Sequence, residues 1–212
     1  MKAMSGNFRF TRDYVLENDC VMLRPVAFHD VENLLEYACN EPDLWRYALI
    51  SAAGSDNMVR YINNAIKARS LKRQYAFIVF DKTTQTYAGS TRFCEINRDV
   101  QCVQLGYTWY GKRFRGTALN KHCKLLLLDF AFTVMQMERV EFRADVENET
   151  GIEALRRLGC TLEGRLRSCG PSPGAPRRDC YVFSILKKEW EDGLRAALAH
   201  KLFSSLPAAL AL

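Results

Sequence analysis

Residues 104–119, QLGYTWYGKRFRGTAL, decide the fold of this chain. In the first half, Leu105, Tyr107 and Trp109 alternate with small or polar residues, which is the period of a half-buried β-strand. From Leu119 onward, apolar residues recur with the spacing of an amphipathic α-helix. They are Cys123, Leu126, Leu127, Phe130, Ala131 and Val134. The sequence therefore predicts a strand that passes through a tight turn into a long helix.

The turn between strand and helix is basic and contains small residues. It carries Lys112, Arg113 and Arg115, followed by Gly116. The start of a helix leaves backbone N–H groups unpaired and carries a partial positive charge. No strong N-cap residue precedes the helix unless Thr117 takes that role. Because small residues let a ligand approach the backbone and arginines add charge, we predict that this turn binds a phosphate.

The composition is that of an ordinary globular protein. The chain has 212 residues, of which 48% are hydrophobic and 25% are charged. Its net charge of +6 suits an anionic ligand, but the sequence lacks the concentrated basic run of a nucleic-acid-binding protein. No stretch approaches the length of about 18 apolar residues that a membrane span needs, and the first residues open no signal-peptide run. We therefore expect a cytoplasmic protein, monomeric or homodimeric, that binds neither nucleic acid nor membrane.

The eight cysteines include no Cys-x-x-Cys pair. This spacing argues against a zinc ribbon and against a thioredoxin-type site. Most of the cysteines fall in segments with strand or helix periodicity, so we interpret them as buried free thiols in a reducing cytoplasm. We expect no metal site.

The rest of the chain alternates between strand and helix patterns. Two alternating runs, 75–80 and 87–96, precede residues 104–110 with short connections, which predicts an antiparallel meander. The alternating run 140–146 follows the long helix, which predicts a parallel crossover. Further strands are expected at 21–25, 160–167 and 180–186, and further helices at 30–38, 55–71, 150–158 and 189–203.

Two local signals bear on the second half of the chain. Thr150 with Glu153 matches a capping box, which predicts Thr150 as the N-cap of a helix that ends at Gly159. Residues 168–178 contain three prolines and two glycines. We therefore expect a mobile loop there.

The order of elements, with Arg-x-x-Gly-x-Ala at a strand-to-helix junction, resembles a GNAT-type N-acetyltransferase of the RimJ/RimL branch. The resemblance spans residues 15–190. The segments that carry it are Leu23-Arg24-Pro25, Gly89-Ser90, Leu105-Gly106-Tyr107, Arg113-Phe114-Arg115-Gly116-Thr117-Ala118, Asn148, Leu158-Gly159-Cys160-Thr161-Leu162-Glu163-Gly164, Arg178-Asp179 and Lys188-Glu189-Trp190. It implies an α+β fold, a GNAT-like single domain with a mixed, mostly antiparallel central sheet flanked by helices. We expect residues 1–190 to form the acetyltransferase domain and residues 191–212 a C-terminal helical tail.

The resemblance also implies acetyl-CoA as the cosubstrate, bound where the strand ending at Trp109 splays from the strand 140–146. Its pyrophosphate would lie on the backbone N–H groups of residues 114–119, at the anion site already inferred from the turn. The pantetheine arm would pair like an extra strand with residues 107–109, and Asn148 would hold its far end near the sulfur. The expected cofactor-binding residues are Tyr107, Thr108, Trp109, Arg113, Phe114, Arg115, Gly116, Thr117, Ala118, Leu119 and Asn148.

The sequence does not supply the family's usual catalytic acid. Relatives often place a Tyr seven residues after this Asn, or a Ser three residues after it, to protonate the leaving thiolate, but those positions are Leu155 and Gly151 here. Direct transfer still requires a neutral amine held about 3 Å from the thioester carbonyl and a route for its proton. We name Glu95 and Asn148 as the catalytic candidates, with Glu95 as the proton route. The alternative for Glu95 is a solvated carboxylate at a strand end.

Several other residues have two interpretations. Glu141 and Asp145 are second choices for the base. His122 either shuttles protons or lies on a helix surface. Residues 45–47 fall where relatives build the acceptor pocket, although Trp45 could instead pack in the core.

We therefore expect an acetyl-CoA-dependent N-acetyltransferase that acts on a primary amine, either a protein N-terminus or a small amine, by direct attack in a ternary complex. The alternative is a non-catalytic acyl-CoA-binding or regulatory module, because the usual Tyr and Ser are missing. The C-terminal segment either docks on the core, forms a dimer contact or frays.

Overall fold

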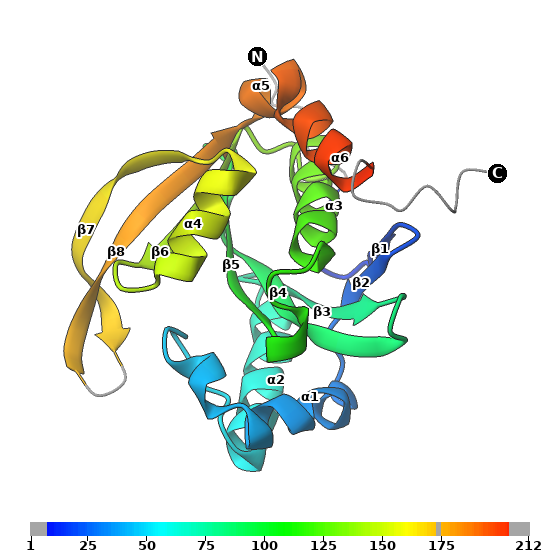
Figure 1. The fold of residues 1–212 in the computed structure, drawn as a ribbon, viewed down its shortest axis with the longest axis vertical. Coiled ribbons are helices and arrows are strands. Elements are labelled where there is room, and N and C mark those ends of the chain that lie inside the picture. Colours follow the sequence, from blue (N-terminus) through cyan, green and yellow to red (C-terminus); the bar gives the residue numbers. More distant parts are fainter. Residues whose placement is uncertain (1–7, 173–174, 204–212) are drawn as a thin grey trace.

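The computed structural model describes residues 8–172 and 175–203, which form one mixed sheet with helices on both faces (Figure 1). The eight strands lie in the order β1-β2-β3-β4-β5-β6-β8-β7. Their bounds are β1 Leu16–Glu17, β2 Val21–Pro25, β3 Tyr75–Asp81, β4 Thr86–Asn97, β5 Cys102–Tyr110, β6 Arg139–Asp145, β7 Thr161–Ser172 and β8 Ala175–Leu186. The helical segments are α1 Asp30–Asn40, η1 Pro42–Trp45, α2 Ser55–Ser70, η2 Lys112–Phe114, α3 Leu119–Thr133, α4 Glu149–Leu158, α5 Lys187–Glu189, η3 Trp190–Leu194 and α6 Arg195–Phe203. The predicted α+β class is confirmed.

The predicted antiparallel meander of β3, β4 and β5 is confirmed. β2 adds antiparallel to β3, and the short β1, which was not predicted, pairs antiparallel with β2 at the edge. α3 then returns the chain so that β6 runs parallel to β5. β8 pairs antiparallel with β6, and β7 pairs with the outer edge of β8. The last strand of the sequence therefore lies between β6 and β7.

Different helices cover the two faces of the sheet. On β4, Arg92 lies against Tyr61 of α2, whereas the next residue, Phe93, stacks on Phe130 of α3. Because successive side chains of a strand point to opposite faces, α2 and α3 cover opposite faces of the sheet. α1 packs beside α2. Each face therefore has its own layer of buried apolar side chains.

The two ends of the described chain both pack against α3. Phe8 is buried, and its ring centroid lies 6.0 Å from that of Phe130. At the other end, Asp129 of α3 accepts hydrogen bonds from Trp190 Nε1 at 2.9 Å and from Arg195. Of the three alternatives for the C-terminal segment, docking on the core is the one observed as far as residue 203. Residues 204–212 of the expected tail lie outside the described part.

The predicted loop at residues 168–178 is wrong, because most of this segment belongs to the long β7–β8 hairpin. Pro171 is tolerated because β7 is the outer strand and uses its N–H groups on one side only. Pro176 lies at the start of β8, before the pairing of β8 with β6 begins. The pairing also shifts register on both sides of Gly170. Residues 173–174, at the tip, lie outside the described part. A composition rich in proline and glycine therefore marks an irregular edge strand in this chain.

The interpretation of the cysteines needs two corrections. Cys169 of β7 and Cys180 of β8 form a disulfide, because the hairpin brings them into facing strands with their Cα atoms 6.1 Å apart. Cys39 is a free thiol, but it is exposed on α1. The free cysteines that are buried, as expected, are Cys94, Cys123 and Cys160.

Candidate active site

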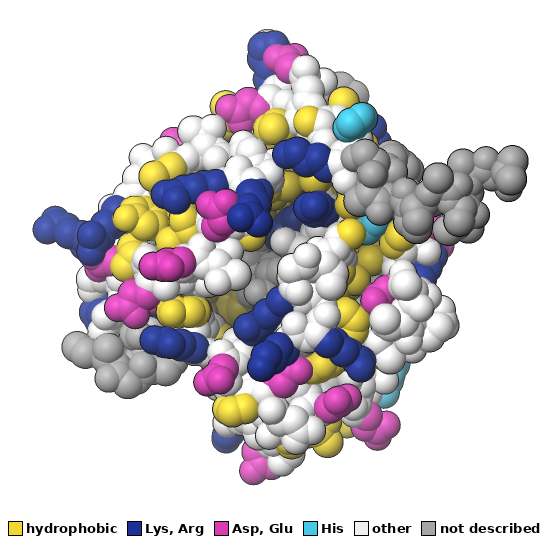
Figure 2. Space-filling model, viewed as in Figure 1, with side chains coloured by type: hydrophobic (Ala, Val, Ile, Leu, Met, Phe, Trp, Pro, Cys, Tyr) yellow, Lys and Arg dark blue, Asp and Glu magenta, His cyan; other side chains and the backbone are white. Residues whose placement is uncertain are grey.

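β5 and β6 separate partway along their length. They pair from Cys102 and Arg139 to Gln104 and Glu141, and among the described residues the pairing does not continue further. β5 runs on to Tyr110 and keeps its pairing with β4. One edge of β5 is therefore free after Gln104, which leaves backbone groups for an extended ligand. Figure 2 shows that the molecule is hollowed beside β5, with lysine and arginine side chains around the hollow.

β5 contains a bulge just past the point of separation. The register shifts between Ser90 and Arg92 of β4, so that Tyr107 and Thr108 of β5 together face one residue of β4. Tyr107 has φ 52°, in the left-handed region. Such a bulge bends and twists a strand and redirects its side chains, and bulges are frequent beside active sites. This bulge lies in the segment expected to pair with the pantetheine arm.

The turn after β5 presents a row of backbone N–H groups. Those of Gly116, Thr117 and Ala118 have no hydrogen-bond acceptor within the described part of the chain. Gly116 has φ 77°, which other residues rarely adopt, and the space beside its Cα is open. The Thr117 hydroxyl accepts from the Leu119 N–H at 3.2 Å, so Thr117 does take part of the N-cap role. Three free donors at the N-terminus of the 15-residue α3 form a site suited to an anion.

Two arginines of the turn have no ion-pair partner among residues 8–172 and 175–203. Arg113 donates to Tyr37 Oη at 3.4 Å, and its guanidinium lies over the ring of Phe114. Arg115 Nε donates to the carbonyl of Tyr110 at 3.4 Å. Both hydrogen bonds are long and go to neutral oxygens. Most of the donors of these two exposed guanidinium groups therefore remain available to a ligand.

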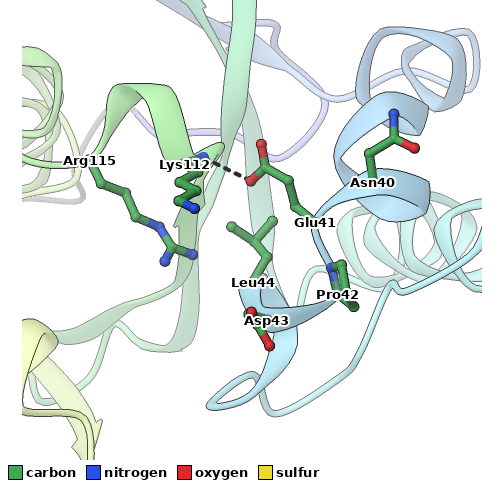
Figure 3. A pocket seen from close by; sticks show the side chains of 7 residues that line it. All are labelled: Asn40, Glu41, Pro42, Asp43, Leu44, Lys112 and Arg115. Carbon is green, nitrogen blue, oxygen red and sulfur yellow. Dashed lines mark hydrogen bonds between the residues drawn. The ribbon is translucent and has the colours of Figure 1, made fainter.

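One carboxylate does reach the start of the turn, from the α1–η1 connection. Glu41 Oε2 accepts from the backbone N–H of Lys112 at 2.8 Å (Figure 3). Figure 3 shows Lys112 and Arg115 facing residues 40–44 across a small hollow of about 110 Å³. This contact holds the start of the turn in place and leaves the N–H groups of Gly116, Thr117 and Ala118 free.

Asn148 caps α4 rather than standing free of it. Its Oδ1 accepts from the Gly151 N–H at 3.0 Å. α4 begins one residue before Thr150, so the predicted capping box is wrong, and Glu153 instead forms an ion pair one turn further along α4. The Asn148 Nδ2 group has no hydrogen-bond partner among the described residues. A contact between Asn148 and a ligand stays a prediction. The atom available for it is Nδ2, which would donate the hydrogen bond.

The three carboxylate candidates differ in their surroundings. Glu95 is exposed, lies in a second register shift of β4 with φ 47°, and has no ion-pair partner in the described part of the chain. Glu141 pairs with Arg143 at 2.8 Å, and Asp145 pairs with Arg178 at 3.3 Å. The ion pairs already engage oxygens of Glu141 and Asp145, whereas the carboxylate of Glu95 is open to solvent. Glu95 therefore stays the first candidate for the proton route.

Arg178 of β8 joins three segments beside the end of β6. Its buried guanidinium donates to the carbonyls of Tyr47 at 2.8 Å and Ala48 at 3.1 Å, and it contacts Asp145. The connection between η1 and α2 is thereby held against the hairpin. This connection includes Tyr47, which the sequence places at the acceptor pocket, so its position fits a wall of that pocket.

An aromatic cluster fills the α2 face next to the bulge. Trp45 is buried with its ring centroid 4.9 Å from that of Trp109, so core packing is confirmed for Trp45. Trp109 Nε1 donates to Tyr61 Oη at 3.2 Å. The guanidinium of Arg92 lies between two rings, 4.5 Å from the centroid of Tyr61 and 4.4 Å from that of Tyr107. Arg92 therefore joins the cluster to the strand that carries the bulge.

The sequence analysis missed Arg92, although a signal for it was present. In the β4 segment 87–94, every residue other than Arg92 is uncharged. A lone charge in an uncharged strand indicates a buried polar site, because arginine is almost never fully buried unless it is paired.

The buried thiols beside the site are not nucleophiles at neutral pH. Burial raises the pKa of Cys94, Cys123 and Cys160 to about 12 in each case. A thiol must ionise before it attacks a carbonyl. These cysteines therefore pack as small apolar side chains.

His122 lies on the side of α3 that faces β1. Its Nδ1 is 3.1 Å from Asn18 Nδ2, at hydrogen-bond distance, and burial lowers the pKa of the ring. β1 is at the opposite edge of the first half of the sheet from β5. This position gives no support to a proton shuttle at the separation of β5 and β6.

Within residues 8–172 and 175–203, no three His, Cys, Asp or Glu side chains are grouped so as to hold a metal ion. In the same ranges, no helix combines the length and the apolar character needed to cross a bilayer.

The chain is similar to known acetyltransferases along most of its length. A family model described as an acetyltransferase (GNAT) domain matches residues 21–161. The uncharacterized N-acetyltransferase p20 of Bacillus licheniformis is 28% identical over 180 residues, which cover 82% of this chain and 97% of that protein.

Two solved structures share the fold. A GCN5-related N-acetyltransferase from Brucella melitensis has a TM-score of 0.83 at 21% identity, covering 93% of this chain and 89% of that chain. Mycobacterium smegmatis RimJ, in complex with CoA-disulfide, has a TM-score of 0.75 at 18% identity, covering 89% of this chain and 93% of that chain. At these identities the structures show the fold alone, and the family match adds the activity. The resemblance to the RimJ/RimL branch stays a prediction. The chain belongs to the GNAT family of acetyltransferases and is an acetyltransferase.

Proposed function

We propose that this enzyme transfers the acetyl group of acetyl-CoA to a primary amine by direct attack within a ternary complex. The observation that carries the proposal is the row of free N–H groups at residues 116–118 directly after the free edge of β5. A helix N-terminus with unpaired arginines suits a pyrophosphate, and a free strand edge suits the amide groups of a pantetheine arm. Two neighbouring features of the chain thus fit two parts of one ligand.

The expected cofactor-binding residues have a role in this arrangement, except Leu119, whose N–H already donates to the Thr117 hydroxyl. Residues 107–109 offer backbone groups on the free edge of β5, and Asn148 offers its Nδ2 donor from the start of α4. Arg113 and Arg115 add charge beside the row of N–H groups. Phe114 is buried and anchors the turn, which positions these donors.

Bound acetyl-CoA supplies an activated acetyl group, and the chain has to orient the amine and remove its proton. Direct attack is supported by the protonated state of the buried thiols, because no thiolate among them is available to carry the acetyl group. Glu95 accepts the proton of the amine, directly or through water, because it is exposed and unpaired. Gly151 and Leu155 offer no acid, so the leaving thiolate takes its proton from solvent, to which exposed Glu95 in turn releases the proton of the amine.

The double variant Arg115→Glu, Gly116→Glu tests the phosphate site. It reverses one charge and places a side chain where φ is 77°. A hydrogen bond to a charged group contributes about 1.5–3 kcal/mol, so loss of the arginine contact alone should lower the affinity for CoA roughly 10- to 150-fold. Titration calorimetry measures this affinity, and Arg60→Glu on the exposed side of α2 is the control. Unchanged affinity in the double variant would place the phosphates elsewhere.

Release of free CoA thiol from acetyl-CoA, with a panel of amines and peptides, tests the reaction. Intersecting initial-rate lines support the ternary complex, and parallel lines would indicate a covalent acetyl-enzyme. Tight acetyl-CoA binding without turnover of any acceptor would favour the non-catalytic acyl-CoA-binding module.

A further inference from the structure

Arg92 is a buried cation without a counter-charge. The residue is 1% exposed, and it forms no ion pair with any described residue. Its Nη1 donates to Gln74 Oε1 at 3.0 Å, whereas its Nε and Nη2 are buried with no partner. Buried charges in proteins are usually paired, because an unpaired charge loses its hydration without compensation. The missing partner of Arg92 therefore calls for an explanation.

The neighbouring side chains hold the Arg92 guanidinium in place but leave two of its N–H donor groups without an acceptor. The rings of Tyr61 and Tyr107 lie on it, 4.5 and 4.4 Å from their centroids, and an aromatic face attracts a cation. Ring faces accept no in-plane hydrogen bonds, so they leave the edge of the guanidinium free. The two unsatisfied groups, Nε and Nη2, are adjacent donors of the planar fork. This fork matches a carboxylate with two parallel hydrogen bonds.

The position of Arg92 places this fork beside the site of acetyl transfer. Arg92 pairs in register with Gly106, two residues beyond the last β5–β6 pair. It lies under Tyr107, the residue at the bulge, on the face of the sheet that α2 covers. The phosphate turn leads into α3, which covers the other face. An amine that approaches the separation of β5 and β6 from the α2 face would therefore approach on the same face as Arg92.

Two of the side chains that contact the guanidinium, Tyr107 and Gln74, are themselves only partly buried. Trp45 belongs to the same aromatic cluster, and its Nε1 is also buried without a partner. The unsatisfied side-chain atoms of the described cluster are therefore all donors. A ligand that fits them must bring acceptor oxygens.

We propose that Arg92 binds a carboxylate of the acceptor, and that the acceptor is a small amine that also carries a carboxylate, as amino acids do. This inference rests on the proposed amine acetylation and specifies its substrate class. A protein N-terminus presents a neutral amide at the position where an amino acid presents its carboxylate. Such an acceptor would leave the charge of Arg92 unpaired, so the structure favours the small acid over the peptide.

The test compares matched acceptors by their kcat/KM in the CoA-release assay. The set is an α-amino acid, its carboxamide and a dipeptide that begins with the same residue. They are compared at equal concentration of unprotonated amine, because the carboxamide lowers the pKa of the amine. We expect the wild-type protein to prefer the acid over the carboxamide and the dipeptide by roughly tenfold or more, the scale of one charge-assisted hydrogen bond.

Substitutions of Arg92 then test whether its guanidinium causes the preference for the acid over the carboxamide. Arg92→Gln should bring the acid-to-carboxamide ratio close to one, and Arg92→Lys should give an intermediate ratio because it keeps the charge without the fork. A ratio within one variant does not depend on how much of the protein is folded. Trp45→Phe, which removes one N–H and keeps an aromatic ring, is the second variant and should reduce the preference. Arg98→Gln is the control, since Arg98 also lies over aromatic rings but is exposed and outside the site.

Equal turnover of the acid and the carboxamide by the wild-type protein would overturn the proposal, and so would a ratio that Arg92→Gln leaves unchanged. Both outcomes leave the amine acetylation standing. If no amine is acetylated, the proposed function fails. The carboxylate site is then tested separately, by calorimetric titration of the amino acid and its carboxamide into the protein in the presence of CoA. Binding of the amino acid that is lost in Arg92→Gln supports the site. Equal binding of the acid and the carboxamide, or no binding of either, overturns it.

Discussion

Replacing Arg178 with methionine should be among the more damaging substitutions in this protein. The Arg178 and Asp145 side chains are 6% and 7% exposed, and the guanidinium also donates to the carbonyls of Tyr47 and Ala48. Methionine leaves Asp145 as a buried charge without a cation. Removing one partner of a buried pair costs about 3–5 kcal/mol. Asp145 keeps its hydrogen bond from the Glu147 N–H at 2.9 Å, so we expect about 3 kcal/mol, near the lower end.

Urea unfolding measures this loss, and it should appear in a thermal scan as a fall of roughly 6–12 °C in Tm for a domain of this size. Arg143→Met is the matched control. Arg143 pairs with Glu141 on the same strand as Asp145, but its side chain is 40% exposed, so its loss should cost less than about 1 kcal/mol.

A double-mutant cycle with Asp145→Asn separates the ion pair from the rest of the Arg178 contacts. Because the neutral amide leaves no isolated charge, the double variant should be less destabilised than the sum of the two single variants. A loss below about 1 kcal/mol for Arg178→Met, or strict additivity in the cycle, would refute the reasoning.

Three further outcomes follow from the structure. Asn148→Ala should lower the free energy of unfolding by about 1 kcal/mol through loss of the N-cap, whereas Asn148→Asp should keep the cap and lose only the Nδ2 donor. If Asn148→Asp leaves the free energy of unfolding unchanged but weakens CoA binding in calorimetry, Asn148 contacts the ligand. If the affinity for CoA is also unchanged, Asn148 makes no such contact. Lys124 is buried over the ring of Phe142, and burial lowers its pKa to about 8, against about 10.4 in an unfolded chain. The penalty for burying this amine is fully present below pH 8 and disappears as the pH rises through about 10.4. Lys124→Met should therefore raise the free energy of unfolding by about 3 kcal/mol at pH 7 and by much less at pH 10.5. Urea unfolding at the two pH values measures this gain, and an equal gain at both would contradict the prediction. Glu95→Gln should lower kcat about tenfold or more if Glu95 accepts the proton. Unchanged rates in the CoA-release assay would show that Glu95 is a solvated carboxylate with no part in the reaction.

The strand, turn and helix of residues 104–119 were accessible from the sequence because their signals are local. A period of two residues gives way to a period of 3.6, and the small and basic residues mark the junction. The N–H groups of Gly116, Thr117 and Ala118 are left free in the structure because these residues precede the first turn of α3 and no described carbonyl accepts from them. For such a site, sequence and structure carry nearly the same information.

The contacts of Arg92 could not be predicted from local sequence patterns. Its environment comes from Tyr61 on α2, Gln74 before β3 and Tyr107 on β5, and no spacing in the sequence connects these residues. The N-cap of α4 shows a smaller failure. Asn148 and Thr150 are both good capping residues, and which of them caps depends on where β6 ends. The strands at 160–167 and 180–186 were predicted, but their extension through most of residues 168–178 was missed because strand order, which lets an outer strand carry Pro171, is a property of the whole sheet.

The position of β8 constrains the order in which the protein takes shape during synthesis. β8 is the last strand to leave the ribosome, yet it lies between β6 and β7 and pairs with both. β6 and β7 therefore wait with unpaired edges while residues up to 186 are made, whereas the phosphate turn and β1 to β5 are already complete. Hairpins close within microseconds, so β7 and β8 pair with each other first and then dock on β6 as a unit. A newly made chain thus completes the turn at residues 112–118 before the hairpin that holds Tyr47 and Ala48 is in place, and until then the outer edge of β6 is open to pairing with another chain.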